Sequence, residues 1–135
     1  MGANTKDENS AQGRRKCREP GTVARVQSFE VAEAAARLRD RGGGTDVVHT
    51  SPGLEVSVYV LVAPEEDKQV LHALDEIYVV LDGDGEIDVA GERRPIRRGE
   101  GVFVPADTEH RLHAYEEMTL LVGFNGPQSS SITAP

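Results

Sequence analysis

Two histidines and one glutamate are the most chemically informative residues of this sequence: His72, Glu76 and His110. Residues 71–83 hold the first two and end in an apolar run typical of a β-strand. Side chains of a strand repeat every second residue, so we expect His72 and Glu76 to project from the same face. Two imidazoles and one carboxylate that meet at one point bind a divalent metal ion with open coordination positions. We therefore predict a metal site formed by these three residues.

The segments around these residues resemble the paired motifs of the cupin superfamily, G-x5-H-x-H-x3-E-x6-G and G-x5-P-x-G-x2-H-x3-N. His72, Glu76 and Gly83 stand at the second histidine, the glutamate and the closing glycine of the first motif. Gly99, Pro105 and His110 match the second motif at the family spacing. The resemblance covers about residues 47–124. It implies an all-β fold, a double-stranded β-helix (the jelly-roll or cupin barrel).

Four positions depart from the family pattern. Pro64, Val70, Asp107 and Ala114 replace the opening glycine, the first histidine, the middle glycine of motif two and the final asparagine. Val70 removes one of the four family ligands, which leaves three protein donors and open positions for water or substrate. Fe, Mn, Ni and Zn all suit this donor set, so the identity of the metal stays open. Cupin barrels without metal also exist, so the alternative is a degenerate or empty site.

The chain divides into a tail, a barrel domain and a second tail. Residues 1–22 are polar and aperiodic, and we predict that they are disordered, as are residues 127–135. Residues 23–126 form the barrel domain with one short N-terminal helix at about 28–40. Ser28 is its expected N-cap, and Gly42-Gly43-Gly44 ends it. Its apolar stripe should pack against the outside of the barrel.

From Asp46 onward the pattern predicts strands alone. They are expected at Asp46–His49, Leu54–Ala63, Glu76–Leu81, Glu86–Val89, Arg93–Ile96, Gly101–Val104, Arg111–Tyr115 and Thr119–Phe124. Residues 82–85 and 90–92 are typical of tight hairpins, and residues 97–100 of another turn. Short strands joined by turns are typical of a small barrel or jelly roll.

Composition excludes several classes of function. The formal net charge is −8, and residues 1–20 carry a small positive excess, so the remaining chain is still more acidic. Such a body repels phosphate backbones, and we expect no nucleic-acid partner. No apolar run is long enough to span a bilayer, so we expect no membrane partner. The single cysteine, Cys17, fits a cytoplasmic protein and reads as an incidental thiol on a mobile tail.

Several other residues are weaker candidates. Tyr78 follows Glu76 on the same strand face, where its phenol would act as general acid or simply pack in the core. His113, His49 and Gln69 have the wrong parity or stand alone, and we expect them outside the site. Asp75 reads as a solvated residue. Asp107 and Glu109 would support His110 or serve as ordinary loop acids.

The strand at residues 76–81 also predicts an interface. If Glu76 points inward, then Ile77, Val79 and Leu81 point outward, and a large apolar face needs cover. Either the N-terminal helix or a second subunit would provide it. We expect a homodimer, which is also common among proteins that the chain resembles.

Two classes of function follow, and the sequence leaves open whether the protein is an enzyme. The first is a metal-binding cupin that acts on a small polar metabolite, by dioxygenase chemistry or by isomerase or epimerase chemistry. The second is a non-catalytic module that binds or senses a small ligand.

Overall fold

The computed structural model of the chain describes residues 25–68 and 71–128. These residues form a short helix, α2 (Val31–Asp40), and eight strands. The strands are β1 (Gly44–Ser51), β2 (Leu54–Val62), β3 (Glu76–Asp82), β4 (Asp84–Val89), β5 (Glu92–Arg97), β6 (Gly101–Val104), β7 (His110–His113) and β8 (Glu117–Phe124). Each predicted strand is present with small shifts at its ends. The predictions for the N-terminal tail, Cys17, Gln69 and Val70 lie outside the described residues.

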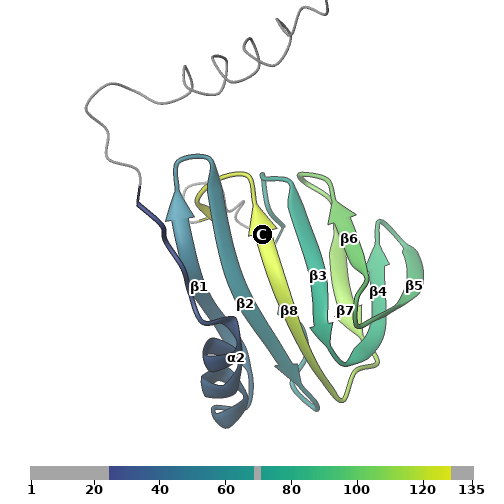
Figure 1. Cartoon of the computed structure of the whole chain (residues 1–135). Helices are drawn as coiled ribbons and strands as arrows, with labels where there is room; N and C mark the ends of the chain where they lie inside the picture. The colour runs from purple at the N-terminus through teal and green to yellow at the C-terminus, as the bar shows by residue number, and fades with distance from the viewer. Residues whose placement is uncertain (1–24, 69–70, 129–135) are drawn as a thin grey trace, which may run out of the picture.

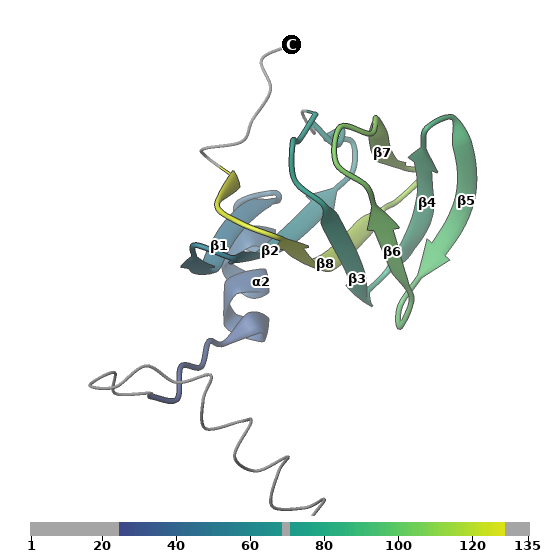
Figure 2. The same ribbon diagram turned by 90° about the horizontal axis from the view of Figure 1, so that it is seen from above.

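The strands form two antiparallel sheets (Figures 1 and 2). One sheet has the order β1-β2-β8-β3-β6 and the other has the order β5-β4-β7. Neighbours such as β2 and β8 are far apart in sequence, as a jelly roll requires. The predicted all-β double-stranded β-helix is confirmed.

Apolar side chains from both sheets fill the space between them. The main cluster includes Tyr78, Ile87, Leu112, Leu120 and Val122, which come from strands of both sheets. On β3, Glu76, Tyr78 and Val80 are buried while Ile77 is exposed, so the predicted inward and outward faces are confirmed. Glu76 therefore stands on a strand whose other inward residues, Tyr78 and Val80, belong to the core.

Helix α2 packs against the outer face of β1 and β2, as predicted (Figure 1). Ala34, Ala35 and Leu38 are its buried residues, and they contact Val58 and Val60 of β2. The helix begins at Val31, and its N-cap position is Glu30, so the predicted cap at Ser28 is wrong. Burial of the apolar stripe stabilises this start without a capping side chain. Among the described residues, no helix is long and apolar enough to cross a membrane.

The predicted hairpin at residues 82–85 is also wrong. β3 pairs with β6 and β8, whereas β4 pairs with β5 and β7, so this turn carries the chain from one sheet to the other. Gly83 has φ 85°, and a Cβ there would lie 2.1 Å from the carbonyl oxygen of Glu117. The glycine is needed because two backbones meet closely at this corner. The hairpin predicted at residues 90–92 does join the paired strands β4 and β5.

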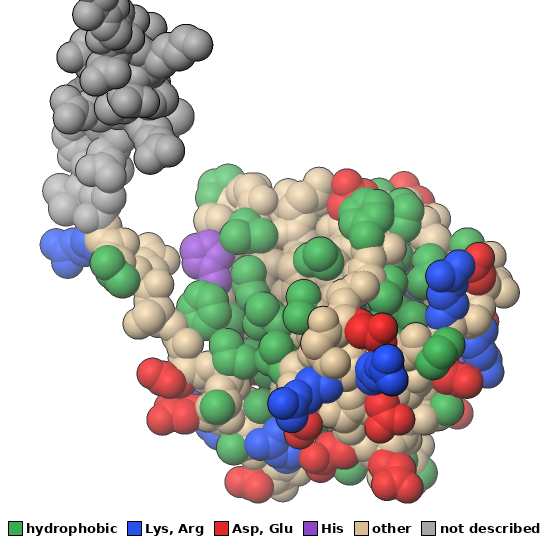
Figure 3. Space-filling model, turned by 45° about the vertical axis from the view of Figure 1, so that its right-hand side comes forward, with side chains coloured by type: hydrophobic (Ala, Val, Ile, Leu, Met, Phe, Trp, Pro, Cys, Tyr) green, Lys and Arg blue, Asp and Glu red, His purple; other side chains and the backbone are tan. Residues whose placement is uncertain are grey.

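Part of the outer face of the large sheet has no cover. Ile77 and Phe103 are paired on β3 and β6, and they are 49% and 58% exposed. Helix α2 contacts β1 and β2 and so leaves this part of the sheet open. Figure 3 shows hydrophobic side chains gathered on this side of the molecule above a belt of charged side chains. The sequence analysis left open whether the N-terminal helix or a second subunit covers this face, and helix α2 does not lie over Ile77.

Candidate metal centre

His72, Glu76 and His110 come together from a loop and two strands. Glu76 is the first residue of β3, and His110 is the first residue of β7. His72 lies before β3 rather than within it, so the strand-period argument for its direction is wrong. A backbone hydrogen bond from the N–H of Asp107 to the carbonyl of His72, at 2.7 Å, holds that loop in place. Contact between the two motifs therefore positions His72.

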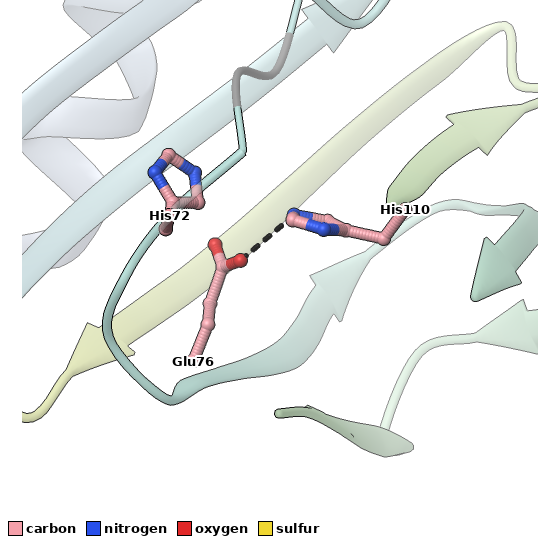
Figure 4. Close-up of side chains that lie close together, drawn as sticks. All are labelled: His72, Glu76 and His110. Atoms are coloured by element: carbon pink, nitrogen blue, oxygen red, sulfur yellow. Dashed lines mark ion pairs between the residues drawn. The ribbon is translucent and has the colours of Figure 1, made fainter. Parts of the chain in front are cut away.

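The three side chains converge on a single point (Figure 4). Each offers one ligand atom, and these atoms all lie within 4.8 Å of one another. Nε2 of His110 lies 2.9 Å from Oε1 of Glu76. His72 and Glu76 are 3% and 2% exposed. This is the geometry of two imidazoles and a carboxylate around one small cation.

The buried carboxylate of Glu76 fits a cation better than it fits an apolar core. Within the described part of the chain, neither of its oxygens has a hydrogen bond of normal geometry. A buried polar group without a partner costs about 1–3 kcal/mol, and a charged one costs more. A divalent ion held by the three donors would compensate the charge of this carboxylate. The residues present thus fit the predicted metal.

The hydrogen bonds of the two rings prepare them as ligands. Nδ1 of His110 donates to the carbonyl oxygen of Thr108 at 2.8 Å, which leaves Nε2 to face Glu76. Burial alone would lower the pKa of His110, but the close contact with the carboxylate of Glu76 and the hydrogen bond to the carbonyl of Thr108 raise it above its usual value. For His72, burial lowers the pKa despite the charge of Glu76. A neutral His72 keeps the lone pair that a metal requires.

Gln128 is a site residue that the sequence did not reveal. Its side-chain nitrogen lies 3.1 Å from Nδ1 of His72, and its backbone N–H donates to Glu55. The predicted C-terminal tail spans residues 127–135, yet residues 127 and 128 belong to the described structure. Nothing in the local sequence indicates this contact, because 56 residues separate the two partners.

A pocket of about 140 Å³ opens beside two of the three candidate ligands, His72 and Glu76. It is lined by Thr45, Ser57, Tyr59, Lys68, His72, Glu76, Val122, Phe124 and Gln128. Most of its polar residues come from outside the two family motifs. A ligand in this pocket would contact His72 and Glu76 directly, so binding of a small molecule and of a metal would be coupled.

Asp67 is a second buried carboxylate near the centre, and the sequence analysis missed it. It is 1% exposed and accepts hydrogen bonds from the hydroxyl of Tyr59, at 2.5 Å, and from the N–H of Leu112, at 2.8 Å. Burial raises its pKa although both hydrogen bonds oppose this. Burial, followed by the charge of Asp67, raises the pKa of Tyr59 well above its usual value. The pair links the pocket wall to β7.

Tyr78 and the remaining candidates lie outside the metal cluster. Tyr78 is fully buried in the core, 6.0 Å from His110 between ring centroids, and does not line the pocket. Its proposed role as general acid stays a prediction. His49 and His113 take no part in the cluster of the described residues, as expected.

Three acidic residues near the site, Asp75, Asp107 and Glu109, lie outside the metal cluster of the described residues. Asp107 keeps a left-handed φ of 57° at the place of the family glycine, and its N–H contacts the His72 loop. The side chain of Glu109 is exposed. Asp75 is exposed as predicted, but its carboxylate also accepts a hydrogen bond from Ala106 at 3.0 Å. These contacts tie the two ligand-bearing loops together.

Comparison with known proteins agrees with this architecture of a small barrel. A family model for the cupin domain matches residues 58–124. An uncharacterised protein of Streptomyces coelicolor is 39% identical over 105 residues, which are 77% of this chain and the whole of that protein. The chain belongs to the cupin family.

Solved structures support the fold. An RmlC-like cupin from Desulfovibrio desulfuricans matches with a TM-score of 0.64 and 27% identity, over 75% of this chain and 97% of that one. An RmlC-like cupin of double-stranded β-helix fold from Methanocaldococcus jannaschii matches with a TM-score of 0.60 and 13% identity, over 82% and 96% of the two chains. The second likeness bears on the fold alone.

Proposed function

We propose that this cupin binds one divalent metal ion through His72, Glu76 and His110 and acts on a small polar metabolite in the adjacent pocket. The observation that carries the proposal is the buried carboxylate of Glu76, which lies between two imidazoles and accepts no hydrogen bond of normal geometry from the described residues. Three protein donors leave open positions, which favours chemistry over a closed structural role. Fe, Mn, Ni and Zn remain the candidates.

The residues around the centre have separable roles in such chemistry. A bound divalent metal would polarise a substrate oxygen as a Lewis acid or, as Fe(II), support dioxygenase chemistry. Glu76, as a ligand, is a poor proton carrier. Tyr59 lines the pocket and, with Asp67, holds a proton at its edge. Tyr78 lies in the core and would act only through its neighbours.

A binding or sensing module is the second candidate. The positions of the two tyrosines favour this candidate. The hydroxyl of Tyr59 already donates to Asp67, and Tyr78 does not line the pocket. Neither phenol is thus placed as an obvious proton donor to a substrate. In this case the pocket would capture a metabolite without transforming it.

We further propose a homodimer formed by the uncovered face around Ile77 and Phe103. A contiguous apolar surface on a small acidic protein favours a second copy with the same face, because association buries both patches. A cytoplasmic location and the lack of a nucleic-acid partner stay predictions.

Metal analysis of the purified protein together with His72→Ala tests the main proposal. We expect one divalent ion per chain in the wild type and a loss of at least tenfold in metal affinity in the variant, because one of three donors is gone. His113→Ala, a partly buried histidine outside the cluster, is the matched control and should keep the metal. Oxygen consumption or substrate turnover would favour the enzyme, and metabolite binding without turnover the sensor. A wild type that takes up no metal would contradict both the enzyme and the metal site.

A further inference from the structure

Strand β2 presents a polar stripe to the barrel interior. Its apolar residues Val58 and Val60 lie under helix α2, on the outside, while the alternate residues face inward. The register shows this directly: Ser57 pairs with Val122, which in turn pairs with Tyr78 of β3. The inward residues of β2 include Glu55, Ser57 and Tyr59, where β8 offers only apolar residues. A sheet does not need such a stripe for packing, so it points to a ligand.

Ser57 is the strongest sign of that ligand. Ser57 is 2% exposed, and its hydroxyl has no hydrogen-bond partner among the described residues. The side chain lines the pocket beside His72 and Glu76. Buried hydroxyls are normally paired, since leaving one unpaired costs free energy. An oxygen of a bound molecule would pair it.

Two other polar residues of the pocket lining, Tyr59 and Lys68, indicate which functional groups the bound molecule has. Because the hydroxyl hydrogen of Tyr59 is donated to Asp67, the phenol oxygen can offer only an acceptor to the pocket. It therefore suits a ligand hydroxyl. Lys68, at the rim, offers a cation, and its exposed ion pair with Glu65, at 3.7 Å, is weak enough to exchange for a ligand anion.

The size of the pocket and its apolar wall limit the rest of the ligand. Its volume of about 140 Å³ is close to that of a cavity of about 150 Å³ that accommodates benzene. Val122 and Phe124 form the wall between β2 and β3 and would contact carbon atoms. A molecule with a short carbon skeleton fits, and an extended polymer does not.

We propose that the pocket binds a small hydroxycarboxylate, with its hydroxyl on Ser57 and Tyr59 and its carboxylate toward Lys68 and the metal. This deepens the proposed function and rests on it. Three buried carboxylates lie at or behind the wall: Glu76 lines the pocket, and Asp67 and Glu55 accept hydrogen bonds from the lining residues Tyr59 and Gln128. In the metal-free protein they repel an anion, whereas a divalent ion at Glu76 reverses the local charge. The proposal therefore requires that hydroxycarboxylate binding depends on the metal.

Calorimetry with lactate, lactamide and propane-1,2-diol tests the proposal. These probes share the hydroxyl and the three-carbon size but differ in charge and chelating power. We expect metal-loaded protein to bind lactate and the metal-free protein not to bind it, with the two neutral probes at least tenfold weaker. Lys68→Gln should weaken lactate binding roughly twofold to fivefold, as an exposed charge does, and this difference should vanish at high salt. Ser57→Ala should weaken it roughly threefold to tenfold.

Two variants outside the pocket serve as matched controls. Thr50→Ala removes an exposed hydroxyl of β1, and Arg94→Gln removes an exposed cation of β5. Both should bind lactate as the wild type does. Equal affinity for lactate in Ser57→Ala, Lys68→Gln and the wild type would show binding to the metal alone and would overturn the proposal. Metal uptake without lactate binding, or with equal binding of propane-1,2-diol, would also overturn it while the proposed function stood. A chain that binds no metal would instead remove the proposed function itself.

Discussion

Oε1 of Glu76 and Nε2 of His110 lie 2.9 Å apart, and both side chains are almost fully buried. In the metal-free protein this contact is a carboxylate–imidazole pair, which raises the pKa of His110. A metal ion that binds there must take the place of the shared proton. Metal affinity and protonation are therefore linked at this site.

Gln128→Ala should reduce metal affinity without removing a ligand. The amide of Gln128 lies against Nδ1 of His72 and orients the ring, and loss of such an outer partner typically costs 10- to 100-fold in affinity. Gln27→Ala, at an exposed position before helix α2, is the control. Competitive titration against a metal indicator measures both variants. Equal affinity of Gln128→Ala and the wild type would refute the orienting role.

Gly83→Ala should destabilise the fold far more than Gly91→Ala. Both glycines have nearly the same left-handed φ, 85° and 86°. At Gly91 no atom lies within 4 Å of an added Cβ, so only the backbone strain of about 1–2 kcal/mol applies. At Gly83 the added Cβ meets a carbonyl oxygen, and overpacking adds roughly 1–3 kcal/mol. Urea unfolding of the two variants measures the difference, and equal losses would contradict the close corner between the sheets.

Asp67→Asn should change how stability depends on pH. Burial raises the pKa of Asp67, so the folded state holds this proton more tightly than the unfolded state does. The free energy of unfolding of the wild type therefore falls as pH rises from about 4, the ordinary value, through the raised pKa. The variant lacks this titration. The free energy of unfolding of the wild type minus that of the variant, measured in urea melts, should thus decrease as pH rises. An increase would show that folding lowers the pKa of Asp67 and would contradict the prediction.

Ile77→Lys should prevent the proposed dimer. Ile77 and Phe103 are neighbours on the uncovered face, and a buried lysine there would be desolvated on association. Light scattering after size exclusion should give a dimer for the wild type and a monomer for the variant. Val26→Lys changes an apolar residue that is 97% exposed, and it should leave the mass unchanged. A monomeric wild type at micromolar concentrations would contradict the dimer.

The fold was accessible from sequence because strands and turns leave local patterns. Alternation around Glu76 correctly placed Tyr78 inward and Ile77 outward. Applied to β2, the same rule would not identify the inner face, because the apolar residues Val58 and Val60 lie under helix α2 and the polar residues Ser57 and Tyr59 line the pocket. Period alone identifies two faces of a strand but not which of them is inside when both are covered.

The site was only partly predictable, because local patterns reveal residues within motifs but not contacts between distant segments. The candidate metal donors lie in motifs with fixed spacing, so His72, Glu76 and His110 could be named from sequence. Gln128 and Asp67 make contacts across long sequence separations, because their bonded partners lie 56 and 45 positions away. No local signal marks such residues, and their roles become visible only when the sheets are assembled.

Isothermal titration of the metal-free wild type and of Glu76→Gln with Fe(II), Mn(II), Ni(II) and Zn(II) tests the metal centre most directly. Bound metal should also stabilise the fold: at a metal concentration 100 times the dissociation constant, the free energy of unfolding of the wild type should rise by about 2.7 kcal/mol. We predict one site per chain in the wild type, a large loss of affinity in Glu76→Gln, and no change in Glu117→Gln, an exposed glutamate of β8. Binding of equal strength in the wild type and in Glu76→Gln, or no binding of any of the four ions, would contradict the account.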